Sequence, residues 1–370
     1  MAGRTLRLVK EFLFPDSAEH RAIPVLDGGL SANDELDGFD ELVEPGRLEP
    51  VDVVPDPSGG VVVSAADTLW RIAAAGSAPD AIVPLPGAAG PLAAEAGGSL
   101  LVGVAGRGLA RVADGTADFV ATEAGGAPLG CLTAVAVAGE HLYATDGSTA
   151  CTPDDWARDL LEKRRAGRLV EVDPRTGATR VLAADLAWPS GVCPAGDGRS
   201  LLVAEAWRHR ILRVDTTTGA REIVRDNLAG YPAQIHPDGA GRFWVSFIAL
   251  RTHLVEFILR EDEYRTDMLA SVPPDFWIRP ALRTTGERWE PLQIGQVKHL
   301  NVTKPWAPPR SYGLVARMDG DGAFDRSFQS RSGATRHGCL SARQDGDRLL
   351  VACAGGRTVL ATALDAGGQR

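Results

Sequence analysis

Two ionisable side chains lie where predicted strands begin or end, and both could exchange protons with a substrate. His337 opens one strand, and an imidazole titrates near neutrality, as a general acid or base requires. Glu205 closes another strand. We take His337 and Glu205 as candidate catalytic residues. Each has a structural alternative: His337 could serve only as a hydrogen-bonding residue. Glu205 could pair with Arg208 or Arg210 inside the fold.

Further polar and aromatic side chains near strand ends could contact a substrate. Asp146 could equally cap the turn that Gly147 and Ser148 form. Cys339 follows His337 by two residues and suggests a thiol beside a base, but no third group that would orient the base is visible. The candidate substrate-binding residues are Arg107, Asp146, Trp188, Ser190, Trp207, Tyr231, Gln234 and Cys339. We predict no metal ligand and no cofactor.

The strands that would position these side chains come from a repeated sequence pattern. The stretch 167–182, rich in Val and Leu and turning at Asp-Pro-Arg-Thr-Gly, is repeated at 210–224 with a turn at Asp-Thr-Thr-Thr-Gly. Short apolar strands between such turns are typical of all-β blades. Six copies begin near Leu48, Pro91, Leu132, Pro189, Tyr231 and His337. We predict a six-bladed β-propeller over 48–370, with 1–47 as a segment that packs on it or closes it.

The geometry of a propeller predicts where the ligand site lies. The start of each inner strand and the end of the next strand share one face because the two are antiparallel. Side chains from six blades would therefore converge at one mouth of the central channel, the expected site. Residues 148–166 predict a short helix inserted in blade 3, and 252–310 a longer insertion between blades 5 and 6. The longer one is a candidate lid; packing against the outer strands is the alternative.

Composition limits the classes of function. The chain has a net charge of −9 and lacks the concentrated basic surface that nucleic-acid binding needs, so we expect no nucleic-acid partner. No stretch reaches the length of a membrane span, and Lys10 and Glu11 interrupt the apolar N-terminus before a signal-peptide core forms, so we expect a cytoplasmic protein without a membrane partner. The five cysteines are widely spaced, which predicts reduced thiols. Oligomeric state is not predicted.

Several motifs resemble those of the strictosidine synthase-like family, in matching order over about residues 48–362. They are Leu142-Tyr-Ala-Thr-Asp-Gly-Ser148, Asp159-Leu-Leu-Glu162, the 167–177 strand and turn, Leu201-Leu-Val-Ala-Glu205, Arg210-Ile-Leu-Arg213, Asp226-Asn-Leu-Ala-Gly-Tyr-Pro232, Gly241-Arg-Phe-Trp-Val245 and Tyr312-Gly-Leu-Val315. The resemblance implies a six-bladed propeller related to gluconolactonases and paraoxonase-type lactonases.

The resemblance also implies two chemistries. The plant synthase condenses an aromatic ethylamine with an aldehyde through a glutamate, without a metal; the lactonases use a divalent metal, usually calcium. The residues of neither chemistry are matched here. The synthase glutamate falls near Cys339 or Leu340, and the metal ligands fall at Thr133-Ala134, Ser190, Ala233 and on or beside Val51, where Glu49 and Asp52 flank the position. Calcium needs several oxygen ligands at one point.

Three functions follow from these observations. The first is a metal-independent enzyme that uses acid–base groups to promote condensation, cyclisation or cleavage of an organic, partly aromatic small molecule, a lyase in specialised metabolism. The second is a lactone or ester hydrolase that keeps a metal through Glu49 and backbone carbonyls. The third is a non-catalytic propeller that binds a ligand or partner. Catalysis by lysine Schiff base is disfavoured because none of the four lysines falls at a blade mouth.

Overall fold

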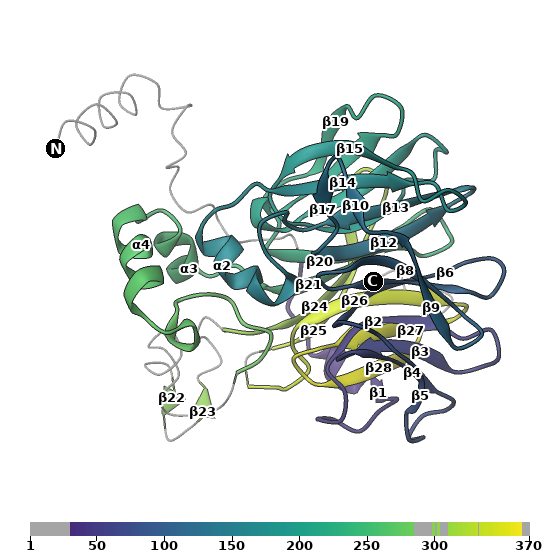
Figure 1. Ribbon diagram of the computed structural model, residues 1–370. Coiled ribbons are helices and arrows are strands. Elements are labelled where there is room, and N and C mark those ends of the chain that lie inside the picture. Colours follow the sequence, from purple (N-terminus) through teal and green to yellow (C-terminus); the bar gives the residue numbers. More distant parts are fainter. Residues whose placement is uncertain (1–29, 285–297, 300–301, 304–309, 332, 365–370) are drawn as a thin grey trace.

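The computed structural model describes residues 30–284, 298–299, 302–303, 310–331 and 333–364. Its short strands are joined mostly by tight turns with glycine at positive φ, so each strand pairs antiparallel with its neighbour in the chain. Among the described residues these pairs form six four-stranded sheets set around a central axis (Figure 1). The predicted six-bladed β-propeller is confirmed.

The blades follow one another along the chain, each from its inner to its outer strand. Blade 1 contains β2 (Pro50–Pro55), β3 (Val61–Ala65), β4 (Thr68–Ile72) and β5 (Asp80–Pro84). Blade 2 contains β6 (Ala89–Ala94), β7 (Leu100–Val104), β8 (Gly108–Ala113) and β9 (Thr116–Ala121). Blade 3 contains β12 (Leu132–Ala138), β13 (His141–Asp146), β14 (Gly167–Val172) and β15 (Thr179–Leu186).

The second half of the ring has the same plan. Blade 4 contains β16 (Pro189–Pro194), β17 (Ser200–Glu205), β18 (Arg210–Asp215) and β19 (Arg221–Arg225). Blade 5 contains β20 (Gly230–Pro237), β21 (Phe243–Leu250), β24 (Gly313–Met318) and β25 (Phe324–Ser330). Blade 6 contains β26 (Cys339–Asp345), β27 (Arg348–Cys353) and β28 (Thr358–Ala363), and its outer strand is β1 (Asp40–Glu41).

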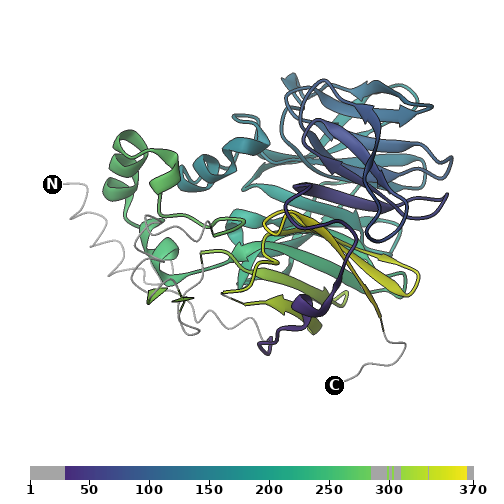
Figure 2. The same cartoon turned by 90° about the horizontal axis from the view of Figure 1, so that it is seen from below.

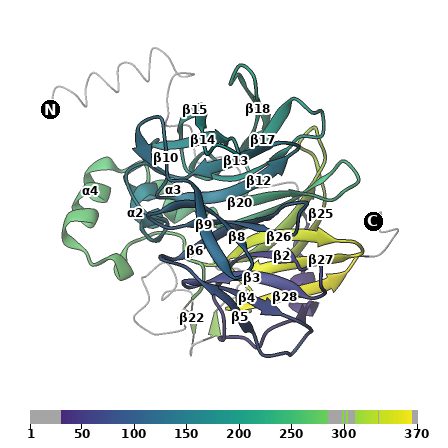
Figure 3. The ribbon, with the colours of Figure 1, turned by 45° about the vertical axis from the view of Figure 1, so that its right-hand side comes forward.

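The ring is therefore closed by strands from distant parts of the chain. Asp40 and Glu41 of β1 pair antiparallel with Ala361 and Leu360 of β28. The first and last inner strands, β2 and β26, lie side by side next to this seam (Figure 3). Every inner strand thus has a neighbour on both sides, as a closed ring requires.

Buried aliphatic side chains form one cluster at each seam between neighbouring blades. At the seam of blades 1 and 2, Leu69 packs in the same cluster as Leu92. At the seam of blades 4 and 5, Leu202 packs in the same cluster as Val245. Because these side chains are buried on both sheet faces, the second strand of a blade, such as β3 (Val-Val-Val-Ser-Ala) or β7 (Leu-Leu-Val-Gly-Val), is a nearly continuous apolar run rather than an alternating one.

Two insertions leave the repeat. Between β13 and β14 lie η3 (Pro153–Asp155) and α2 (Trp156–Leu161); after β21 come α3 (His253–Ile258), α4 (Asp262–Ser271) and η5 (Pro274–Phe276). The prediction that the longer insertion separates blades 5 and 6 is wrong. It lies within blade 5, because β24 pairs with β21 and completes that sheet. Trp289 and Trp306, also expected in it, lie outside the described residues.

Both insertions connect the second strand of a blade to the third, so both leave the propeller on the face where the inner strands begin. Helices α2, α3 and α4 gather at one side of the ring in both Figure 1 and Figure 2, and α4 contacts α2 and α3. Leu161 of α2, Ile258 of α3 and Met268 of α4 share one buried cluster with Trp277. No helix in the described part of the chain is long and apolar enough to cross a membrane.

Candidate functional site

Each inner strand breaks its pairing register near its first residue. The unpaired residues are Val51, Gly90 with Pro91, Thr133, Ser190, Ala233 with Gln234, and Leu340. A β-bulge of this kind leaves a residue outside the ladder and re-aims it. All of these residues line one cavity of about 310 Å³ at the mouth of the channel. The fold therefore directs one bulge from every blade into a single site.

The cavity wall is mostly apolar and is completed from above by the insertions. Pro153, Asp154 and Trp156 come from the insertion in blade 3, and Leu282 comes from the insertion in blade 5. Glu49, just before β2, adds a second carboxylate. A concave, mostly apolar cavity with a few polar groups is the usual form of a small-molecule site.

Trp188 forms one side of the cavity in a backbone conformation that bulky residues rarely adopt. Its φ is +54°, in the left-handed region, and its side chain is buried. Trp207 of η4 (Ala206–Arg208) stacks on it with ring centroids 5.2 Å apart. Such strain persists only where surrounding contacts enforce it, and it is concentrated at functional sites.

The insertion in blade 3 is bonded to this aromatic wall. Trp207 donates its Nε1–H to the Asp159 carboxylate of α2 at 2.8 Å, and Trp156 lies 6.1 Å from Trp207 between ring centroids. Burial raises the pKa of Asp159, although hydrogen bonds from Ser148 and Trp207 oppose the shift. Three tryptophans from blade 4 and α2 therefore form one packed group at the cavity.

The hydroxyl groups on the cavity wall join neighbouring blades. Thr133 Oγ1 of blade 3 donates to the carbonyl of Pro189 at 2.5 Å, and Ser190 Oγ of blade 4 donates to the carbonyl of Pro232 at 2.7 Å. Both side chains have used their only proton, so what they offer the cavity is hydrogen-bond accepting oxygen. Their first role is to connect the inner strands around the ring.

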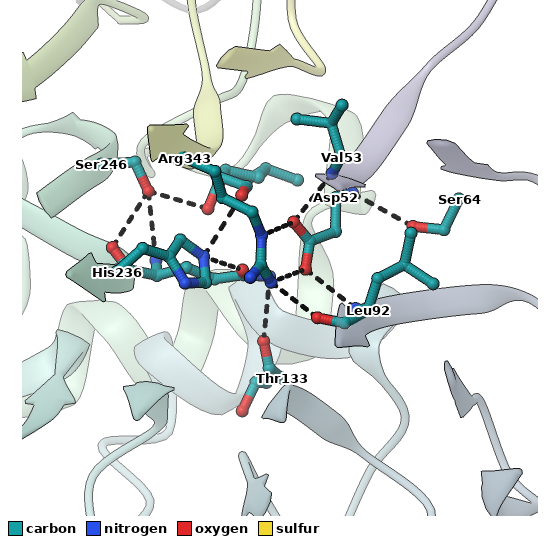
Figure 4. Close-up of polar contacts among 11 residues, drawn as sticks. Asp52, Val53, Ser64, Leu92, Thr133, His236, Ser246 and Arg343 are labelled. Carbon is teal, nitrogen blue, oxygen red and sulfur yellow. Dashed lines mark hydrogen bonds and ion pairs between the residues drawn. The ribbon is translucent and has the colours of Figure 1, made fainter. Parts of the chain in front are cut away.

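Beneath the cavity, the channel contains a buried ion pair (Figure 4). Arg343 of β26 donates to Asp52 of β2 at 3.0 Å and to the carbonyl of Leu92 at 2.6 Å. Asp52 is fully buried and also accepts from the backbone N–H of Val53 and of Leu92, each at 2.8 Å. Burial acts to raise the pKa of Asp52, but the Arg343 guanidinium outweighs it and holds the pKa below its usual value.

A histidine links this ion pair to the cavity wall. His236 Nε2 lies 2.8 Å from the side-chain oxygen of Gln234 and 3.4 Å from the hydroxyl of Ser341. Burial, helped by the charge of Arg343, holds the pKa of His236 well below its usual value. His236 is therefore neutral at pH 7. Sequence reasoning missed His236, Asp52 and Arg343 as parts of this network, because nothing local marks three residues from three blades as neighbours.

Three of the predicted substrate-binding residues line the cavity: Trp188, Ser190 and Gln234. The other predicted residues lie elsewhere. Trp207 and Tyr231 stand behind the wall, with Tyr231 edge-on to Trp207 at 5.9 Å and its hydroxyl without a hydrogen-bond partner among the described residues. Arg107 is exposed in a turn, and Cys339 is buried against Cys353 on the paired strand.

The two predicted catalytic residues do not line the cavity. His337 is buried; its Nδ1 lies 2.8 Å from Ser311 Oγ and its Nε2 lies 3.1 Å from the carbonyl of Arg331. Gly338, at φ +63°, turns the backbone before β26 and so separates His337 from the residues that follow. Burial lowers the pKa of His337. Both ring nitrogens of His337 therefore have partners within the protein.

Glu205 and Asp146 occupy equivalent places in successive blades. Glu205 accepts from the Ala187 N–H at 2.8 Å and from Arg210 Nε at 2.6 Å. Asp146 accepts from the Cys131 N–H at 3.0 Å and from Arg168 Nε at 2.9 Å. Each carboxylate ends the second strand of its blade and pairs with an arginine that begins the third. Both are buried within the wall rather than exposed to the cavity.

In the described part of the chain, the acid–base groups that line the cavity are Glu49 and Asp154. Glu49 accepts from Arg283 at 2.8 Å, and both partners of this pair are about half exposed. Asp154 lies in the first turn of η3 and is exposed. Asp154 was missed in the sequence because it sits in an insertion, where no repeat predicts its position. Among the described residues, no group of three or more His, Cys, Asp or Glu side chains could hold a metal ion.

Comparisons with known proteins agree with this architecture. Residues 133–218 match the strictosidine synthase family model. Strictosidine synthase-like protein 4 of Arabidopsis thaliana is 32% identical over 155 residues, 41% of this chain and 42% of the relative. The adipocyte plasma membrane-associated protein of Danio rerio is 32% identical over 198 residues, 53% of this chain and 42% of the relative. The chain thus spans about two fifths of the length of these curated relatives.

Two solved structures share the fold. A gluconolactonase from Xanthomonas campestris superimposes with a TM-score of 0.53 at 14% identity, covering 88% of this chain and 97% of its own. Regucalcin from Agrobacterium tumefaciens, a calcium-binding protein, superimposes with a TM-score of 0.52 at 16% identity. The match covers 90% of this chain and 94% of regucalcin. The similarity to strictosidine synthase-like proteins, predicted from motifs, is confirmed, and the two solved structures share the propeller fold.

Proposed function

We propose that this chain is a small-molecule enzyme that binds an organic, partly aromatic substrate in the mouth cavity and acts on it by acid–base catalysis without a metal. The observation that carries the proposal is the convergence of six bulges on one mostly apolar cavity that also receives two carboxylates. A condensation, cyclisation or bond cleavage in specialised metabolism fits such a site. Substrate positioning against a fixed wall would supply much of the rate enhancement.

The roles within the cavity follow from the contacts. Trp156 and Trp188 offer flat apolar surface, and the stacked ring of Trp207 keeps the Trp188 ring in one place. Glu49 and Asp154 are the groups that could take a proton from the substrate or return one. Ser190 and Thr133 accept hydrogen bonds. The aromatic wall of the cavity holds the substrate by its shape, and the carboxylates at the rim of the cavity exchange protons with it.

The residues at the mouth do not fit the calcium site of the related lactonases. Calcium takes six to eight oxygen ligands, several of them charged. At the positions where such ligands would be needed, Val51, Ala134 and Ala233 offer no side-chain oxygen, and Glu49 is already paired with Arg283. These side chains support metal-independent catalysis over the hydrolase alternative.

Turnover of two substrate classes tests the proposal. Purified protein is incubated with 2-phenylethylamine and phenylacetaldehyde, and separately with phenyl acetate or gluconolactone, with and without EDTA, and products are followed by mass spectrometry. We expect chelator-independent turnover that falls about 100-fold or more in Asp154→Asn or Glu49→Gln. Glu140→Gln is the matched control. Glu140 is an exposed carboxylate on the turn between β12 and β13, and it is paired with Arg175.

Three results would change the assignment. Lactone or ester hydrolysis that is lost with EDTA would establish the hydrolase. Binding of these compounds without any product would establish a non-catalytic binding propeller. Equal loss of activity in Glu140→Gln would mean that the carboxylate variants act through charge or stability rather than through the site.

A further inference from the structure

We infer that His236 positions the side-chain amide of Gln234 so that its NH2 group faces the mouth cavity and donates a hydrogen bond to an uncharged acceptor, a carbonyl oxygen, on the substrate. This inference rests on the proposed function, since it names how the same cavity recognises one group of its ligand. It assigns a positioning role to His236 and a substrate-contacting role to Gln234.

The contact between the two side chains fixes which atoms face each other. Gln234 Oε1 lies 2.8 Å from His236 Nε2. An amide oxygen only accepts, so the neutral imidazole must carry its proton on Nε2 and donate it. Protonation of His236 would leave this donor in place. The oxygen of the Gln234 amide therefore faces His236 in the channel, and the amide nitrogen points away from His236.

A second contact opposes the reversed amide. Gln234 Nε2 lies 3.5 Å from the carbonyl oxygen of Thr133, at the outer limit of a hydrogen bond. Rotating the amide by half a turn would bring Oε1 against that carbonyl, two acceptors with no proton between them. The backbone of Gln234 is also held, because its N–H donates to Ser246 Oγ, which in turn donates to the carbonyl of Leu340 (Figure 4).

The amide therefore keeps hydrogen-bond donor capacity for the cavity. Of its two N–H groups, one is directed to Thr133 through the long contact, and no other partner for Nε2 occurs among the described residues. Gln234 is 3% exposed and lines the cavity, so this donor can be satisfied there only by water or by a ligand that accepts from it. Thr133 and Ser190 have already given their protons to neighbouring blades.

The charges around the cavity select an uncharged acceptor. The guanidinium of Arg343 beneath the floor is neutralised by Asp52. Asp154 at the rim is acidic and would repel a carboxylate or phosphate group, and the charge of the other rim carboxylate, Glu49, is balanced by Arg283. A ketone, aldehyde, ester or lactone oxygen meets the donor without that repulsion.

A matched pair of ligands tests the inference directly. 2-Acetylnaphthalene and 2-isopropenylnaphthalene have the same shape but differ in C=O against C=CH2. We expect the protein to bind the ketone about 5-fold more tightly in equilibrium dialysis, the effect of one net hydrogen bond. Gln234→Glu should abolish that preference, since it removes the donors while keeping the shape. Gln329→Glu is the matched control, because Gln329 is also buried but bonds Tyr312 and Ser31 away from the cavity.

The positioning role of His236 has its own signature. His236→Leu should lose the preference for the ketone while retaining affinity for the alkene, and His236→Gln, which restores a donor at similar reach, should recover it. If these variants do not fold, the wild type still decides the matter: in protein labelled with 15N-glutamine, the ketone and not the alkene should shift one side-chain NH2 signal.

Equal binding of both naphthalenes would overturn the inference and leave the proposed cavity function standing. Binding of neither would overturn both. A full preference for the ketone in His236→Leu would show that Gln234 needs no positioning by His236, and would reject that part.

Discussion

Trp207 stacks on Trp188 at 5.2 Å between ring centroids with the planes 25° apart, and so holds a left-handed backbone residue in the cavity wall. Trp207 is in turn bonded to Asp159 of the blade 3 insertion. The strain at Trp188 and the docking of α2 are thereby coupled through a single side chain.

The left-handed φ of Trp188 predicts that glycine and alanine substitutions there differ in stability in the opposite order from the usual one. Trp188→Gly should be more stable than Trp188→Ala by about 1 kcal/mol, because alanine keeps the cost of the left-handed region while glycine does not. Trp244, fully buried in β21 with ordinary φ, is the control, and there glycine should be the less stable. Urea unfolding of the four variants measures both differences. The same order at both sites would contradict the assignment of strain.

The buried ion pair in the channel predicts a strong and pH-dependent effect of Arg343→Met. Asp52 would then be buried without its partner, which costs about 3–5 kcal/mol at pH 7. The folded-state pKa of Asp52 is below its usual value in the wild type, so its contribution is present above the ordinary Asp pKa and is lost as pH falls through the lower folded value. In the variant the pKa should rise instead.

The deficit of Arg343→Met should therefore shrink between pH 7 and pH 4, where Asp52 can take up a proton in the variant. Urea unfolding at the two pH values measures it. Arg331→Met, which breaks an exposed pair with Asp34, should change the free energy of unfolding little at either pH. A deficit that stays constant with pH would mean that lost packing, not the unpaired carboxylate, is responsible.

Three buried histidines predict acid lability. Burial lowers the pKa of His209, His236 and His337 in the folded state. The unfolded chain then binds more protons below the ordinary histidine pKa of about 6.5, so the free energy of unfolding should fall as pH drops from 7 to 5, by up to about 1.4 kcal/mol per pH unit for each histidine.

Urea titrations at pH 8, 7, 6 and 5 measure this slope. His236→Gln should reduce it, because one group that takes up a proton only on unfolding has been removed. His141, more than half accessible and 3.0 Å from Glu171, is the surface control, and His141→Gln should change the slope less than His236→Gln does. A flat profile from pH 7 to 5 in the wild type would show that the three imidazoles are not buried in their neutral form.

Close approach of two inner strands predicts that Gly191 tolerates no side chain. A Cβ there would lie 2.7 Å from the carbonyl oxygen of Ala233 and 2.9 Å from the nitrogen of Ile235. Gly191→Ala should cost at least about 1–3 kcal/mol, because blades 4 and 5 must separate. Gly97→Ala, at an open turn with nothing within 4 Å, is the control and should change the melting temperature little.

The strands could be predicted well because their signals are local. Leu132 and Pro189 open β12 and β16 as the repeat predicted, since apolar runs and Gly turns fix short strands without reference to the rest of the chain. The position of the longer insertion could not be predicted, because only the pairing of β24 with β21 shows which blade receives the returning strand.

The site was predicted in part, for the same reason. Ser190 and Gln234 lie at strand heads and reach the cavity, as expected. His337 lies at a strand head too, but Gly338 turns the backbone between it and β26. Whether a side chain enters the channel depends on the bulge that follows, which is set by pairing between strands. Asp154 depends on where an insertion docks, which no repeat encodes.

The pairing of β1 with β28 has a consequence for synthesis. Blade 6 is complete only when residues 358–363 have left the ribosome, long after residues 40–41 have emerged. Until then β1 must wait as an unpaired strand while five blades form behind it. Both its residues, Asp40 and Glu41, are acidic and exposed, and charged edge strands resist pairing with the wrong partner. The closing strand thus carries its own protection during translation.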